Sequence, residues 1–129
     1  MRTFEDIDLL YVEDDPETRM SVSTMLKRRF KNIHVAENGQ VGLELYKKYK
    51  SSLIITDIKM PVMNGVEMIE HIRQDASGNP LVMVVTAHRE SDLHSKLADV
   101  HLFKPIDLYQ LLQTAKDLLV RSGKIAALP

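Results

Sequence analysis

Short apolar runs alternate with longer amphipathic stretches along nearly the whole of this chain. An alternation of this kind is typical of βα units wound around a parallel sheet. The third and fourth runs are apolar at consecutive positions, as expected of central strands that are covered on both faces. The five runs are Ile7 to Glu13, Ile33 to Ala36, Leu53 to Ile58, Leu81 to Ala87 and Val100 to Phe103. We therefore predict an α/β fold with one five-stranded parallel sheet and five helices.

The amphipathic stretches predict the helices. Asp15 followed by Pro16 is typical of an N-cap and a first helical position, and opens the first helix. The last helix has the clearest apolar face, with residues at i, i+3, i+4 and i+7 spacing from Leu108 to Leu119. The fourth predicted helix has only a narrow apolar stripe, formed by Leu93 and Leu97.

Composition limits the classes of protein to which the chain can belong. A length of 129 residues with 44% hydrophobic and 27% charged residues suits one globular domain. We assign residues 1–121 to this domain and 122–129 to a tail or the start of a linker. The net charge of −1 argues against direct nucleic-acid binding and against a membrane-surface patch. No signal peptide or membrane-spanning run is apparent and cysteine is absent, so we expect a cytoplasmic protein.

Three carboxylates stand at the ends of two predicted strands. Glu13 and Asp14 close the first run, and Asp57 closes the third. The carboxyl ends of parallel strands meet at the sheet edge where open α/β sheets bind ligands. Crowded carboxylates repel one another, and one would keep its proton unless a cation joined them. The pattern predicts a metal site, and Mg²⁺ fits because it prefers oxygen ligands and accepts few protein carboxylates.

Two further polar residues end the fourth and fifth runs. Thr86 places a hydroxyl at the same edge, and Lys104 follows the last strand. A carboxylate nucleophile, a metal ion, a hydroxyl donor and a lysine are the groups needed to transfer a phosphoryl group to Asp57.

These residues, in this order and spacing, closely resemble the receiver domain of bacterial two-component response regulators. The resemblance rests on Glu13-Asp14, Asp57 with the following Ile-Lys-Met-Pro-Val-Met-Asn-Gly, Thr86-Ala87 and Lys104-Pro105. It implies a doubly wound, flavodoxin-like receiver fold with strand order 2-1-3-4-5. It also implies that Asp57 is the phosphoacceptor. Asp14 would bind Mg²⁺ directly, Glu13 would bind it through water, and the backbone carbonyl of Lys59 would be a further ligand.

The resemblance implies roles for the remaining polar positions. Thr86 and Lys104 would each bond a phosphoryl oxygen, and the peptide bond before the proline that follows the lysine is often cis in this family. His101 occupies the position of the family's switch aromatic, and we expect it to respond together with Thr86. Lys59 and His88 border the path of attacking water, and we expect them to set the lifetime of the phosphoryl group.

The implied function is a phosphorylation-activated signalling switch rather than an enzyme acting on outside substrates. A histidine kinase or phosphotransfer protein would supply the phosphoryl group, which the domain transfers to itself and later hydrolyses. The output would reach a target protein or a fused output domain through the face made by the fourth predicted helix, the fifth strand and the last helix. The resemblance also allows a phosphorylation-linked homodimer through this face.

Three other classes of protein share part of this pattern. A flavodoxin-type carrier needs a phosphate-binding loop after the first strand, where Glu13, Asp14 and Asp15 would repel phosphate. A haloacid dehalogenase-type hydrolase carries a second aspartate two residues after the nucleophile, where this chain has Lys59. The remaining alternative is a degenerate receiver that docks proteins without phosphorylation, and the complete set of acids, hydroxyl and lysine argues against it.

Overall fold

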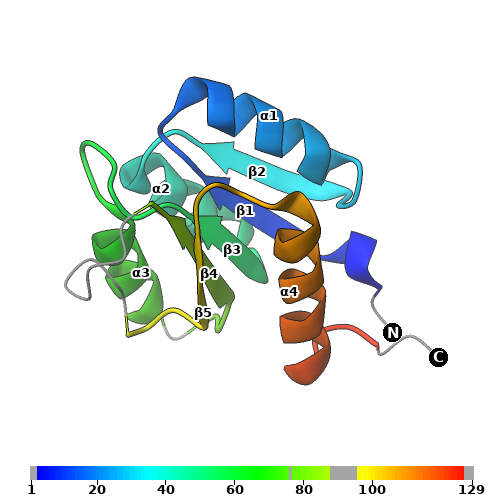
Figure 1. Ribbon diagram of the computed structural model, residues 1–129. Helices are drawn as coiled ribbons and strands as arrows, with labels where there is room; N and C mark the ends of the chain where they lie inside the picture. The colour runs from blue at the N-terminus through cyan, green and yellow to red at the C-terminus, as the bar shows by residue number, and fades with distance from the viewer. Residues whose placement is uncertain (1–2, 76, 88–95, 127–129) are drawn as a thin grey trace.

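The computed structural model describes residues 3–75, 77–87 and 96–126, and its centre is a parallel β-sheet (Figure 1). The strands lie in the order β2-β1-β3-β4-β5, and all of the neighbouring pairs are parallel. The strands are β1 (Asp8–Val12), β2 (Asn32–Ala36), β3 (Leu53–Thr56), β4 (Leu81–Thr86) and β5 (Val100–Phe103). The predicted fold class and strand order are confirmed.

Helices cover both faces of the sheet. They are the short 3-10 helix η1 (Phe4–Asp6) and the α-helices α1 (Pro16–Lys27), α2 (Gly39–Tyr49), α3 (Gly65–Arg73) and α4 (Leu108–Arg121). The described residues thus contain four of the five predicted α-helices. The other was predicted around Leu93 and Leu97, and residues 88–95 lie outside the described part of the chain. None of the helices described is long and apolar enough to cross a membrane.

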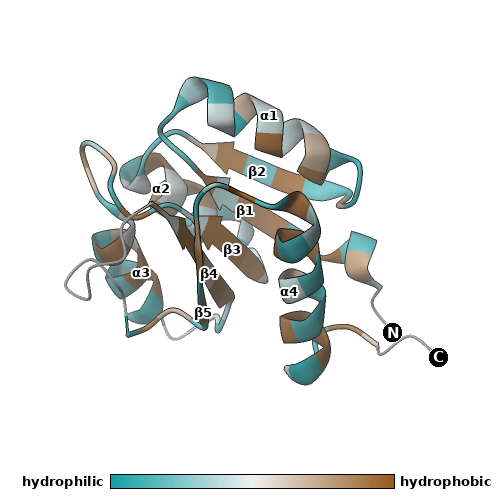
Figure 2. Cartoon of the chain, in the orientation of Figure 1, coloured by the Kyte–Doolittle hydropathy of each residue, from teal (hydrophilic) through white to brown (hydrophobic). Residues whose placement is uncertain are grey.

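The apolar core has two layers, one on each side of the sheet, and hydrophobic residues line the strands between them (Figure 2). Alternate residues of a strand point to opposite faces. Leu53 and Ile55 of β3 accordingly pack with α1 and α4, whereas Ile54 packs with α2 and α3. The residues of β3 and β4 are all buried, which explains why these two strands are apolar at consecutive positions.

Each α-helix begins with a side chain that caps its first turn. Asp15, Asn38, Asn64 and Asp107 accept hydrogen bonds from backbone N–H groups at the starts of α1, α2, α3 and α4. Gly65, the first residue of α3, packs so closely on the end of β3 that a Cβ there would collide with the carbonyl oxygen of Asp57. The caps and this close approach fix the helices that border the carboxyl edge of the sheet.

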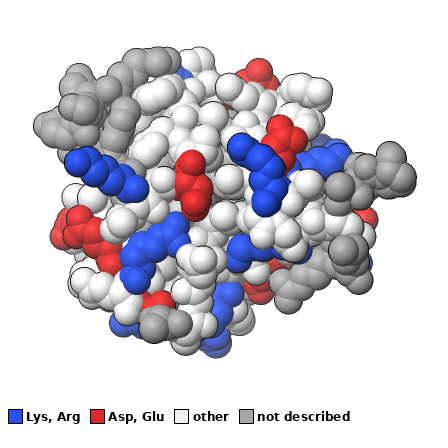
Figure 3. Space-filling model, turned by 90° about the horizontal axis from the view of Figure 1, so that it is seen from below, with Lys and Arg blue, Asp and Glu red and all other residues white. Residues whose placement is uncertain are grey.

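Charge is mixed on the face of the molecule that is seen from below. The face shown in Figure 3 carries basic and acidic side chains interspersed with neutral ones. This distribution agrees with the net charge of −1.

Candidate functional site

The carboxyl edge of the sheet brings the three predicted acids together. Val12 of β1 pairs in register with Thr56 of β3, so Glu13 and Asp57 follow neighbouring strand ends. The N–H of Asp57 donates to the Val12 carbonyl oxygen at 3.1 Å and extends the pairing by one residue. One carboxylate oxygen from each of Glu13, Asp14 and Asp57 lies within 4.8 Å of the other two. The structure therefore forms an acidic cluster where the sequence places it.

Lys104 inserts its ammonium group into this cluster. Its Nζ donates to Glu13 Oε1 and to Asp57 Oδ2, both at 2.8 Å. Both acceptors are shielded from solvent, since Glu13 is 2% exposed and Asp57 is 9% exposed. The backbone N–H of Lys104 donates to the carbonyl oxygen of Thr86 at 2.9 Å, and the peptide bond to Pro105 is cis. Lys104 thus joins the ends of β1, β3 and β4 to the segment that follows β5.

Burial and charge pairing shift the ionisation of two groups in the cluster. Burial raises the pKa of Glu13 above its ordinary value, although the bonds from Lys104 and from the N–H of Asp15 oppose the shift. Burial alone would lower the pKa of Lys104, but its hydrogen bonds to Asp57 and Glu13 outweigh that effect and the pKa is raised. Burial and the bond from Lys104 thus act in opposite directions on Glu13, whereas the bonds to the two carboxylates favour the charged form of Lys104.

Arg19 of α1 supports the backbone that carries the acids. Its Nη1 donates to the carbonyl oxygens of Glu13 at 3.0 Å and Asp14 at 3.1 Å. The N–H of Asp15 donates to Glu13 Oε2 at 3.1 Å, so the Glu13 carboxylate has a partner on each oxygen. Sequence reasoning missed Arg19, because apolar periodicity does not show that a helical arginine reaches back to the loop before its helix.

The other predicted site residues lie in different surroundings. Thr86 is fully buried at the end of β4, one strand from Asp57. His101 is half-buried in β5, where it pairs in register with Val84 of β4. Lys59 is exposed in the loop after Asp57. His88 lies outside the described residues.

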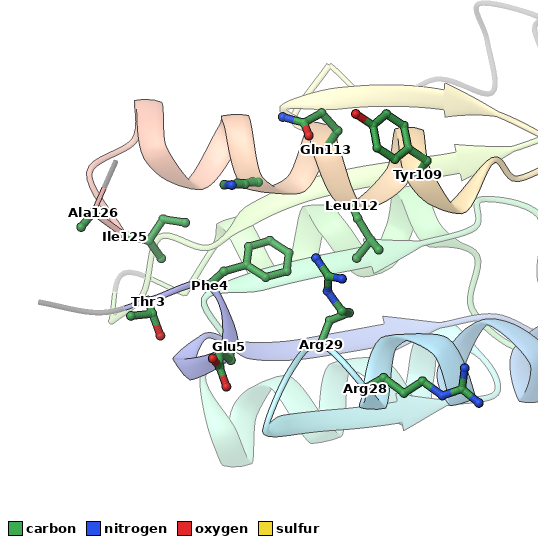
Figure 4. Close-up of a pocket in the computed structure, with 11 residues that line it drawn as sticks. Thr3, Phe4, Glu5, Arg28, Arg29, Tyr109, Leu112, Gln113, Ile125 and Ala126 are labelled. Atoms are coloured by element: carbon green, nitrogen blue, oxygen red, sulfur yellow. The ribbon is translucent and has the colours of Figure 1, made fainter. Parts of the chain in front are cut away.

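Two cavities flank the helices α1 and α4. A cavity of about 490 Å³ opens beside Lys104 and Pro105, between α1 and the start of α4. A larger one of about 630 Å³ lies between η1, the end of α1 and α4, where Phe4, Arg29 and Leu112 point toward one another (Figure 4). None of the predicted site residues lines the larger cavity, so it is separate from the acidic cluster.

The donor set of the cluster fits a hard divalent cation. Glu13, Asp14 and Asp57 offer only oxygen ligands, and their oxygens are close enough together to share one ion. Mg²⁺ binds such groups together with water and phosphate oxygens. The Lys104 ammonium already neutralises part of the negative charge of the cluster. A metal ion bound there would share the Glu13 and Asp57 carboxylates with this lysine.

Asp14→Asn should weaken Mg²⁺ binding about tenfold or more, because it removes one charged oxygen ligand from the cluster. An NMR titration of the backbone amides near the cluster with MgCl₂ would measure the affinity. Asp15→Asn is a matched control, since asparagine caps a helix as well as aspartate does. Equal affinities for Asp14→Asn and the parent would show that the ion binds elsewhere.

Comparisons with known proteins all point to one protein family. The family model of the response regulator receiver domain matches residues 9–116. Protein PilH of Pseudomonas aeruginosa is 31% identical over 116 residues, which cover 86% of this chain and 96% of PilH. An uncharacterized 14.6 kDa protein of Leptolyngbya boryana is 33% identical over 118 residues, which cover 88% of this chain and 90% of that protein.

A solved structure extends the likeness to three dimensions. The CheY-like receiver domain protein of Methanospirillum hungatei superposes with a TM-score of 0.83 at 25% identity, covering 92% of this chain and 98% of the other. With the family match and the relatives, this shows that the chain belongs to the response regulator receiver domains, the phosphorylation-activated switches of two-component signalling.

Proposed function

We propose that Asp57 accepts a phosphoryl group from a histidine kinase or phosphotransfer protein, with Mg²⁺ held by Glu13, Asp14, Asp57 and the carbonyl oxygen of Lys59. The observation that carries this proposal is the position of the Lys104 ammonium, which bonds two carboxylates of the acidic cluster at 2.8 Å. The bound cation would neutralise the incoming phosphate. A lysine positioned on the carboxylate, together with a cation that the three acids would hold, suits phosphoryl transfer better than simple protein docking.

The side chains around Asp57 suggest how the transfer proceeds. The N–H of Ile58 donates to Asp57 Oδ1 at 2.7 Å and orients the carboxylate. A carboxylate oxygen forms the new bond to phosphorus as the bond from phosphorus to the donor nitrogen breaks. Negative charge on the phosphoryl oxygens is then met by Lys104 and the Thr86 hydroxyl.

The response would travel from Thr86 to the neighbouring strand. Phosphorylation adds roughly 1.5 to 2 negative charges and three strong acceptors. Drawing Thr86 and Lys104 toward Asp57 would pull on the backbone hydrogen bond that joins them, and so on β5, which carries His101. The face made by the segment before β5, β5 itself and α4 would then present a changed surface to a target protein or fused output domain, or to a second copy of the chain.

Addition of beryllofluoride and Mg²⁺ tests this proposal, because beryllofluoride on an aspartate imitates the phosphoryl group. We expect amide chemical shifts to change around Asp57 and, beyond it, at Thr86 and His101. A docking module that works without phosphorylation would show no saturable change. Changes confined to the acidic cluster would support phosphoryl binding but contradict the proposed route to β5.

The lifetime of the phosphoryl group should depend on Lys59 and His88. Lys59 is exposed beside the acidic cluster, where its side chain can restrict the in-line approach of water. Decay of labelled protein should change severalfold in Lys59→Asn and in His88→Ala, since about 1.4 kcal/mol in the barrier is tenfold in rate. If both variants decay at the rate of the parent, neither side chain controls the attack of water.

A further inference from the structure

The hydroxyl of Tyr11 is buried and lacks a hydrogen-bond partner among the described residues. Tyr11 lies in β1 and is 3% exposed, and its Oη makes no hydrogen bond in the described part of the chain. A buried hydroxyl without a partner is destabilising, and phenylalanine would fill the same core position without that cost. The hydroxyl therefore calls for an explanation beyond packing.

The strand register places Tyr11 directly before the acidic cluster. Residues two apart in a strand share one face of the sheet. Tyr11 thus lies on the same face as Glu13, and its partner in β3, Ile55, lies on the same face as Asp57. The ring packs in the core layer with α1 and α4. Tyr11 is the last residue of β1 on this face, and the next residue on it is Glu13, which Lys104 joins to Asp57.

The electrostatics of this position keep the hydroxyl protonated. Burial raises the pKa of Tyr11 well above its ordinary value, and the negative charges of Glu13 and Asp57 raise it further. The hydroxyl therefore stays protonated and can donate a hydrogen bond. The carboxylates of Glu13 and Asp57 are the acceptors whose charges act on it.

The carboxylate of Glu13 depends on Lys104 for one of its two bonds. Its Oε2 accepts from the N–H of Asp15, and its Oε1 accepts from Lys104 Nζ. A phosphoryl group on Asp57 would compete for the same ammonium. Glu13 is 2% exposed, so bulk water is a poor substitute for the lost bond. A carboxylate oxygen that also helps to hold Mg²⁺ still has a lone pair for a hydroxyl donor.

We propose that Tyr11 is a positioning residue. Its hydroxyl donates to the Glu13 carboxylate when Lys104 exchanges its hydrogen bond to Glu13 for one to a phosphoryl group on Asp57. The inference rests on the proposed function, because it requires a phosphoryl group to draw the lysine. No covalent bond is made or broken at Tyr11. The unpaired hydroxyl disfavours the unphosphorylated state and gains its partner in the phosphorylated one, so Tyr11 biases the equilibrium toward the active state.

Tyr11→Phe removes only the hydroxyl and tests the proposal. The unphosphorylated variant should be at least as stable to thermal unfolding as the parent, because an unpaired polar group is lost. Its affinity for beryllofluoride in saturating Mg²⁺ should fall about tenfold, as expected for the loss of one hydrogen bond to a charged group. Tyr109→Phe is the matched control, since Tyr109 is 77% exposed.

Tyrosine spectroscopy gives a readout that a purely structural role would not change. The chain has four tyrosines and no tryptophan, so its near-ultraviolet absorption reports on tyrosine. Beryllofluoride should shift this absorption in the parent and in Tyr109→Phe, and the shift should disappear in Tyr11→Phe.

Three results would overturn the inference. They are equal beryllofluoride affinities for Tyr11→Phe and the parent, an unchanged tyrosine spectrum in the parent, and a spectral shift that survives in Tyr11→Phe. A parent protein that fails to bind beryllofluoride would overturn the proposed function as well. The two failures are distinguishable, because only the second appears in the parent's own binding curve.

Discussion

Asp57→Asn should abolish labelling by a small phosphodonor. Acetyl phosphate with Mg²⁺ should add one phosphoryl group to the parent protein and none to the variant, as measured by intact mass. The carboxamide is a much weaker nucleophile than the carboxylate, and the change also removes one of the two negative charges paired with the Lys104 ammonium. The expected loss is therefore complete.

The control for this result is an aspartate outside the cluster. Asp117 lies on the exposed side of α4, and Asp117→Asn should be labelled like the parent. Thermal unfolding of Asp57→Asn would show that the variant is folded. Undiminished labelling of Asp57→Asn would place the phosphoacceptor elsewhere and refute the assignment.

Lys104→Met should have opposite effects on metal binding and on phosphoryl transfer. Without the ammonium, Glu13 and Asp57 lose their shared counterion, so Mg²⁺ no longer competes with a lysine for the same oxygens. We expect Mg²⁺ affinity to rise about tenfold, the equivalent of one charge-assisted hydrogen bond. Labelling by acetyl phosphate should fall steeply, because the variant lacks the ammonium that we propose to stabilise the charge of the transferred group.

The stability of Lys104→Met should also depend on pH in a defined direction. In the parent, burial raises the pKa of Glu13 and the bond from Lys104 restrains the rise. The variant lacks this restraint, so the pKa of Glu13 rises further above its value in the unfolded chain. A carboxyl group with a raised pKa in the folded state favours folding at acidic pH, and that contribution is lost as the pH rises through the raised pKa.

Chemical unfolding without Mg²⁺ at several pH values measures this effect. Relative to the parent, Lys104→Met should lose about 3 kcal/mol at neutral pH and less in acid, because a partly buried ion pair has lost one member. Lys47→Met, at an exposed position of α2, is the control. The free energy of unfolding of Lys104→Met could instead show the same pH dependence as that of the parent, with unchanged Mg²⁺ affinity. This result would show that Lys104 does not hold the two carboxylates.

Much of the architecture could be predicted from the sequence, because buried positions of strands and helices require apolar residues at a recognisable spacing. The consecutive apolar residues of β3 and β4 follow from helices on both faces, and the cap Asp15 marks where the first helix begins. The convergence of the acids and Lys104 follows from parallel strand ends that share one edge. The predicted roles of Thr86 and His101 remain predictions.

Other features depend on side-chain reach, which periodicity does not encode. Arg19 holds the carbonyl oxygens of Glu13 and Asp14 from the next helix, and only its three-dimensional position shows this. In the sequence, Tyr11 is indistinguishable from an ordinary aromatic residue of the core. Only the three-dimensional positions of its neighbours show that its hydroxyl has no partner among the described residues.

The Lys104 bridge has a consequence for a cell short of magnesium. Because the Lys104 ammonium lies between Glu13 and Asp57, the protein itself neutralises part of the negative charge at the carboxyl edge when no metal is bound. Metal scarcity should then silence the protein rather than unfold it. Signalling would resume as soon as magnesium returned, with no need for new synthesis or refolding, and the supply of the ion would set the responsiveness of the pathway but not the abundance of its switch.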